Sequence, residues 1–174
     1  MTKTTLSGQK IAIMVAAGFD EKNFVEIQKM LMGQNAQLKV ISASTGLVQG
    51  WTGTQLGMFY PVDSHLSETL AVDFDALIIP SGKAHLATLA EELHSARIIK
   101  AFLRENMPIL VQGDALDLIS EIDTVIQVEL IRAQGEIGLH NRILWAGAET
   151  SIAQVTREFV AVCLSKQDGD SAAA

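Results

Sequence analysis

Short apolar runs alternate along the chain with longer segments in which apolar residues recur every three or four positions. Residues 11–16 are nearly all apolar, which is typical of a buried parallel strand. Similar runs at 38–43 and 74–80 predict two more strands, and 142–146 predicts a last short one. The Gly-rich segment 46–60, in which large apolar residues are interspersed, predicts a small antiparallel excursion.

Helical spacing fills the stretches between these strands. A helix is predicted to begin at Asn23, because Glu26 completes a capping-box pattern, and to end near Gly33. Segments 84–93 and 95–106 carry helical patterns, and the second is ended by the proline at position 108. A final helix is predicted at about 151–165. Residues 121–142 carry no clear pattern.

A further apolar run, 108–112, stops at Gly113 and Asp114 and gives way to a helical pattern. This order predicts a strand–turn–helix elbow, a place where many α/β enzymes mount a nucleophile. The tip of this elbow is glycine, which adopts a positive φ with no Cβ penalty. We therefore expect the turn to persist, with a positive φ at Gly113, although the residue has no nucleophilic side chain.

The alternation of strands and helices predicts an α/β three-layer sandwich around a mainly parallel sheet. One domain is expected over residues 10–166, between a flexible N-terminal arm at 1–9 and a flexible tail at 167–174. Ligands of such sheets bind at the carboxyl ends of the strands. Segments 17–21, 81–85 and 113–114 should meet there.

Composition excludes several classes of partner. The net charge of −7, with no cluster of basic residues, argues against nucleic acid. The apolar runs are far shorter than the roughly 20 residues of a membrane span, and the polar first nine residues do not resemble a secretory signal. A single cysteine, Cys163, excludes an intrachain disulfide and an all-cysteine metal site. We expect a cytoplasmic protein without a metal or cofactor.

Three motifs carry a family resemblance. Residues 10–15 and the Gly18-Phe19-Asp20 turn resemble a first strand followed by Gly-Phe-Glu. The stretch Phe-Asp-Ala-Leu-Ile-Ile-Pro-Ser-Gly at 74–82 is the most specific match, and 108–109 opens the elbow strand. In this order, and over residues 9–165, the chain resembles the ThiJ/PfpI superfamily, relatives of the class I glutamine amidotransferases. The resemblance implies a flavodoxin-like sheet and a dimer or larger assembly.

The departures from the family pattern fall at the chemical positions. The resemblance places Gly113 where active members carry a nucleophilic cysteine, and Asp114 where they carry the adjacent histidine. Asp20 replaces a supporting glutamate, and Ser81 replaces a glycine in the oxyanion turn that continues with Gly82. The combination is closest in motif to the extra C-terminal domain of large-subunit catalases. The cysteine-dependent glyoxalase, deglycase and peptidase activities are therefore not expected.

Each polar residue of this degenerate site also has a plainer interpretation. Asp114 fits the N-cap of the next helix better than a general base. Asp20 and Asp114 would form a carboxylate pair if they converged, but Asp20 also precedes a helix, where an acid is favoured. Ser81 and His85 would form a nucleophile–base pair only with hydrogen-bond geometry, and a polar loop histidine is the preferred interpretation. Cys163 is expected to be a buried, inert thiol.

The sequence thus predicts a catalytically silent ThiJ/PfpI-like domain that acts as a binding, assembly or stress-related protein. Two alternatives stay open: a cysteine-independent hydrolase or lyase that uses the same crevice, and a catalase-associated accessory domain. A homodimer or larger homo-oligomer is expected, because residues 46–60 gather apolar side chains such as Trp51 and Phe59 outside the main sheet. A small-molecule ligand in the crevice is a further expected partner, whereas nucleic acid and membrane are not.

Overall fold

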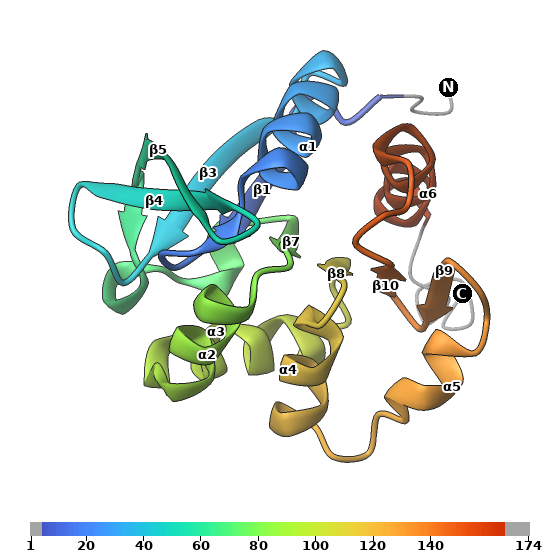
Figure 1. Cartoon of the computed structure of the whole chain (residues 1–174). Helices are drawn as coiled ribbons and strands as arrows, with labels where there is room; N and C mark the ends of the chain where they lie inside the picture. The colour runs from blue at the N-terminus through green and yellow to red at the C-terminus, as the bar shows by residue number, and fades with distance from the viewer. Residues whose placement is uncertain (1–4, 166–174) are drawn as a thin grey trace.

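A seven-stranded sheet forms the centre of the computed structural model, which describes residues 5–165 (Figure 1). The strand order is β6-β3-β1-β7-β8-β10-β9, and only the pairing of β9 with β10 is antiparallel. The bounds of these strands are β1 Lys10–Met14, β3 Gln37–Ser42, β6 Ser64–His65, β7 Ala76–Ile79, β8 Ile109–Gln112, β9 Ile137–His140 and β10 Ile143–Ala146. The predicted parallel α/β sheet is confirmed.

The middle strands β7 and β8 are buried on both faces, which explains their continuous apolar sequences. Helices α1 and α6 cover one face, and α2, α3 and α4 cover the other (Figure 1). The helices are α1 Glu21–Gly33, α2 Lys83–Glu91, α3 Leu93–Arg104, α4 Ala115–Ile122, α5 Val128–Arg132 and α6 Ile152–Leu164. Each of the two longest, α1 and α6, presents an apolar stripe to the sheet. Within residues 5–165, every helix is too short or too polar to cross a membrane.

A second, three-stranded sheet lies beside α1. Its strands are β2 Phe19–Asp20, β4 Leu47–Thr52 and β5 Gln55–Pro61, and β4 pairs with β5 antiparallel. The predicted antiparallel excursion is therefore a hairpin, and β2 joins it to the carboxyl end of β1. Two short 3-10 turns, η1 Leu66–Glu68 and η2 Ala71–Asp73, lead from this region back to β7.

Three features differ from the sequence-based expectations. Helix α1 is capped by Asp20, not by Asn23, so it begins three positions earlier than predicted. Leu6 is fully buried and its N–H bonds the Gln34 carbonyl at 3.1 Å, so the end of the expected loose arm is packed. The stretch 121–142, which carries no clear sequence pattern, contains α5 and β9. Residues 1–4 of the arm and the predicted tail at 167–174 lie outside the described residues.

Candidate functional site

The three predicted segments meet at the carboxyl ends of β1, β7 and β8. The Asp20 N–H donates to the Ser81 carbonyl at 2.8 Å, and the Ser81 hydroxyl donates to Asp20 Oδ2 at 3.4 Å. An ideal Cβ built on Gly113 would lie 3.1 Å from Ser81 Cβ. Each of the three segments follows a parallel strand, and this position alone was enough to predict that they meet.

Asp20 is occupied by its own helix. Its Oδ1 accepts the Asn23 backbone N–H at 3.1 Å, which is the N-cap bond of α1. Its Oδ2 lies 3.4 Å from the Asn23 side-chain amide, which also donates to the Ala148 carbonyl at 3.2 Å. The carboxylate thus joins the start of α1 to Ser81, and Asn23 joins it to the loop after β10.

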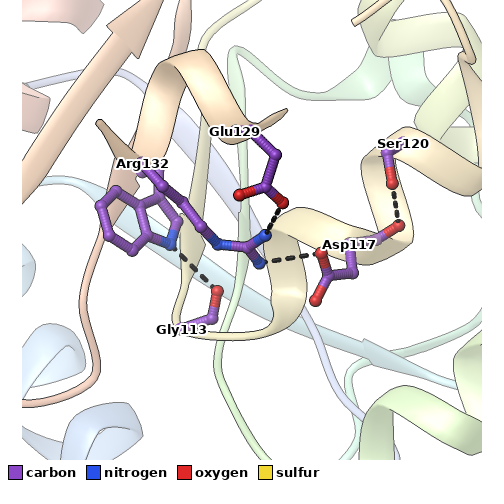
Figure 2. Close-up of polar contacts among 6 residues, drawn as sticks. Gly113, Asp117, Ser120, Glu129 and Arg132 are labelled. Carbon is purple, nitrogen blue, oxygen red and sulfur yellow. Dashed lines mark hydrogen bonds and ion pairs between the residues drawn. The ribbon is translucent and has the colours of Figure 1, made fainter. Parts of the chain in front are cut away.

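The elbow has the predicted backbone, with Gly113 at φ 53°. The Gly113 N–H donates to the Ala146 carbonyl at 2.8 Å. The Gly113 carbonyl accepts the indole N–H of Trp145 at 3.0 Å, as Figure 2 shows. Both peptide groups of the tip are therefore bound by β10, and the turn is held without help from a ligand.

Two neighbouring side chains approach the Cβ position of Gly113. Besides Ser81 Cβ at 3.1 Å, an ideal Cβ on Gly113 would meet Ala148 Cβ at 3.4 Å. The first contact is tighter than ordinary van der Waals separation, so any side chain at position 113 needs its neighbours to move. A side chain at position 113 would therefore be crowded on the side of Ser81.

His85 does not face the crevice, and its interpretation as a polar loop histidine is wrong. It lies in α2 and is fully buried. Its Nδ1 accepts the Ala16 N–H at 3.0 Å, so its Nε2 carries the proton and donates to the Pro80 carbonyl at 2.8 Å. Burial lowers the pKa of the imidazole to about 4. His85 is thus a neutral link between the ends of β1 and β7, and neither ring nitrogen is left for Ser81.

Asp114 occupies the predicted N-cap position of α4 but makes no side-chain capping bond. Its side chain is exposed, and no hydrogen bond joins it to Asp20 within residues 5–165. The ion pairs of this region lie further along: Arg132 in α5 bonds Asp117 in α4 at 2.8 Å and Glu129 at 3.2 Å (Figure 2). The pair with Asp117 attaches α5 to the helix that follows the elbow, whereas the pair with Glu129 lies within α5.

A pocket of about 590 Å³ opens on the hairpin side of Asp20. Its walls come from the hairpin and from the first turns of α2, and its lining includes Gly18, Asp20, Trp51, Gly82, Lys83 and Ala84. Gly113 and Asp114 do not line it. Glycines 18 and 82, at φ 95° and 136°, let segments 17–21 and 81–85 approach each other closely.

Other chemistry is sparse in the part of the chain that the structure describes. No three His, Cys, Asp or Glu side chains within residues 5–165 are grouped to hold a metal ion. Cys163 is buried in α6, and burial raises the pKa of its thiol to about 12. An inert thiol is the physical consequence of that environment.

The sequence-based interpretation missed several residues that build the site. Trp145 binds the elbow, Ala148 lies beside it, and Asn23 binds the Ala148 carbonyl. Lys83 lines the pocket. The role of Trp145 could have been predicted from its place in the sheet, because it lies in β10, which pairs with β8 close to the elbow. Asn23 is predicted as a helix cap, and its side chain instead reaches the loop after β10.

Comparison with known proteins agrees with this geometry. Residues 9–125 match the DJ-1/PfpI family. The catalase HPII of Pseudomonas putida is 30% identical over 100 residues, which are 58% of this chain and 13% of that catalase. General stress protein 18 of Bacillus subtilis is 29% identical over 120 residues, 63% of this chain and 67% of that protein. The chain thus spans a small fraction of the catalase that it matches.

Solved structures place the fold in the same group. A ThiJ/PfpI domain protein from Brachyspira murdochii superposes with a TM-score of 0.73 at 20% identity, covering 90% of this chain and 96% of that one. Its fold is the flavodoxin-like sandwich expected from the sequence. The chain belongs to the DJ-1/PfpI family.

Proposed function

We propose that this chain is a catalytically silent DJ-1/PfpI domain that works through binding and assembly. The observation that carries the proposal is the elbow: residue 113 is glycine, and Ser81 Cβ and Ala148 Cβ lie 3.1 and 3.4 Å from the position of its missing Cβ. A covalent intermediate needs a nucleophilic side chain at a reachable position. The chain supplies none at the elbow, and its single thiol, Cys163, is buried in α6.

The remaining polar groups favour the silent domain over a cysteine-independent hydrolase or lyase. A nucleophilic Ser81 needs a base within hydrogen-bond reach. The imidazole of His85 is bound through both nitrogens to the backbone. Asp20 Oδ2 accepts the Ser81 hydroxyl at a long 3.4 Å, but it also lies 3.4 Å from the Asn23 amide, and Oδ1 of the same carboxylate caps α1. Asp114 is exposed and makes no hydrogen bond to Asp20 or Ser81 in the described residues. The bonds of His85 and Asp20 hold together the segments that follow β1 and β7.

Two similarities favour a role in the stress response. One relative is a general stress protein and another is a catalase, and the chain covers only a small part of that catalase. We therefore propose a stress-related, cytoplasmic role, with association with a catalase as the second candidate. Co-elution of the purified chain with a large-subunit catalase in size-exclusion chromatography would support that candidate, and separate elution would exclude it under those conditions.

The absence of cysteine chemistry can be tested with methylglyoxal. Purified protein should convert it to lactate no faster than buffer, and Cys163→Ser, which removes the only thiol, should behave identically. Turnover above buffer that is retained in Cys163→Ser and abolished by Asp20→Ala would overturn the silent domain. That result would promote the cysteine-independent enzyme to first place.

A further inference from the structure

The outer edge of the main sheet, at β9, is bound by a side chain instead of a strand. β9 is the last strand in the sheet order, so within residues 5–165 no strand lies on its outer side. Oε1 of Gln134 accepts the Leu139 N–H at 2.9 Å, and Nε2 of Gln134 donates to the Leu139 carbonyl at 3.0 Å. One side-chain amide therefore binds both the N–H and the C=O of Leu139.

These two bonds match those that a neighbouring antiparallel strand would make. In an antiparallel ladder, a residue of a hydrogen-bonded pair exchanges both its N–H and its C=O with the residue opposite. The Gln134 amide offers the same donor and acceptor. Peptide groups alternate between the two sides of a strand, so Leu139 faces outward while Gly138 and His140 face β10. The Gln134 side chain thus occupies the place of the next strand.

The two faces of β9 differ in how they are covered. A Cβ on Gly138 would press on the backbone and side chain of Ile131, so the end of α5 covers one face. On the other face a pocket of about 430 Å³ lies between β9 and α6, and its lining includes Leu139 and Val162. Gln134 lines this pocket and also one of about 360 Å³ beside α5. A strand that replaced Gln134 would direct alternate side chains towards the two pockets.

The chemistry of β9 fits a second copy of the same strand. Ile137–His140 contains no Lys, Arg, Asp or Glu, in a chain whose net charge is −7. Two copies therefore repel each other less at this strand than at acidic parts of the surface. An antiparallel pair about a two-fold axis is also self-complementary. With Leu139 opposite the same residue of the second copy, each N–H meets a C=O.

We propose that the outer edge of β9 is a self-pairing surface and that the Gln134 side chain closes it. When this side chain turns away, β9 of one copy pairs with β9 of another, and the sheet continues across a two-fold axis. Proteins commonly protect edge strands by local devices of this kind, because an open edge pairs with other chains. The surface is separate from the β4–β5 hairpin, which lies on the opposite side of the molecule (Figure 1). The inference rests on the proposed assembly role and adds a second surface to it.

The pairing can be tested in a chain whose hairpin surface is disrupted by Leu56→Glu and Phe59→Glu, at two exposed positions of β5. In this background, Gln134→Ala should double the mass measured by light scattering at high micromolar concentration, because it frees the peptide groups of Leu139. Gln37→Ala, at another exposed glutamine, should leave the mass unchanged. Leu139→Pro added to Gln134→Ala should restore the smaller mass with an unchanged circular dichroism spectrum, since proline has no N–H to donate.

Amide hydrogen exchange locates the contact. In Gln134→Ala, the Leu139 N–H should exchange faster than in its parent when the protein is dilute, and more slowly as the concentration rises. The Gly138 N–H, which faces β10, should not respond to concentration.

Three outcomes would overturn the inference: an unchanged mass in Gln134→Ala, a doubled mass that persists with Leu139→Pro, or exchange at Leu139 that is independent of concentration. None of them affects methylglyoxal turnover or the mass of the native chain. Failure of this surface is therefore distinguishable from failure of the proposed function.

Discussion

Gly113 combines two properties at one residue: a positive φ and a crowded Cβ position. Both follow from the chain around it, because β10 binds the two peptide groups of the tip and Ser81 and Ala148 cover it. The positive φ was predictable from the Gly-Asp sequence after an apolar run. The crowding was not, because Ala148 reaches the elbow only through the return of the chain after β10.

Comparing alanine substitutions at Gly113 and Gly53 separates the effect of the positive φ from the effect of the crowded Cβ position. Gly113→Ala should lower the free energy of unfolding by about 1 kcal/mol or more, because alanine is disfavoured at φ 53° and its Cβ would press on Ser81. Gly53→Ala is the matched control, since Gly53 has φ 63° and nothing within 4 Å of an added Cβ. Denaturant unfolding measures both variants. A smaller loss for Gly113→Ala than for Gly53→Ala would contradict the crowding.

His85 should make stability depend on pH. Burial lowers its pKa from 6.5 to about 4, so the unfolded chain takes up a proton at a higher pH than the folded chain. This contribution is fully present above pH 6.5 and is lost as the pH falls from 6.5 towards 4. It is on the order of 3 kcal/mol, because a tenfold change in a proton-binding constant corresponds to about 1.4 kcal/mol.

Denaturant unfolding at several pH values isolates this contribution. The stability difference between the native sequence and His85→Gln should shrink as the pH falls through that window. His140→Gln, at an exposed position, should instead keep the pH dependence of the native sequence. A constant difference between the native sequence and His85→Gln would show that His85 does not stay neutral in the fold.

Among the helices and strands, those that are most buried are also those that the sequence predicts best. Strands β1, β7 and β8 are continuous apolar runs because both of their faces are covered, and they lie where the sequence predicts them. The missed α5 and β9 are five and four residues long and each has a single fully buried residue, so neither carries a full period of buried apolar positions. The two-residue strands β2 and β6 depend wholly on their partners.

The hairpin is bound to α1 through the single tyrosine of the chain. Tyr60 packs on Phe24 at a ring-centroid distance of 4.9 Å and donates its hydroxyl to Glu21. Burial, together with the bond and charge of Glu21, raises its pKa to about 12. The protonated phenol therefore stabilises the fold below pH 10, and this contribution is lost as the pH rises towards 12.

Glu21→Gln should lower the pKa of Tyr60 but leave it above 10, because burial is the larger cause. Tyrosinate absorbance in a pH titration reports this one residue, with circular dichroism to confirm the fold at each pH. Glu26→Gln on the same helix is the control and should leave the titration unchanged. An unchanged pKa in Glu21→Gln would mean that the Glu21–Tyr60 bond is absent in solution.

At the scale of the whole molecule, the hairpin sheet leaves apolar surface uncovered. Trp51 and Tyr60 are half-buried, so part of the aromatic area of this segment is packed within the chain. Leu47, Leu56, Met58 and Phe59 are 54 to 68% exposed and lie on this one hairpin. Apolar residues gathered in this way mark a partner surface more often than isolated ones do.

We therefore predict a homodimer or larger oligomer that uses the hairpin. A two-fold contact is the commonest arrangement for soluble homo-oligomers, and it should bury about 1,600 Å² in total. Light scattering at micromolar concentration should give at least twice the chain mass of 18.7 kDa.

Leu56→Glu combined with Phe59→Glu should reduce the measured mass to that of the monomer, because a buried charge without a partner is strongly unfavourable. Val72→Glu, at a position 83% exposed in η2, should leave the assembly intact. A native mass of 18.7 kDa would instead show that the protein is a monomer and that the exposed hairpin residues make no contact between copies of the chain.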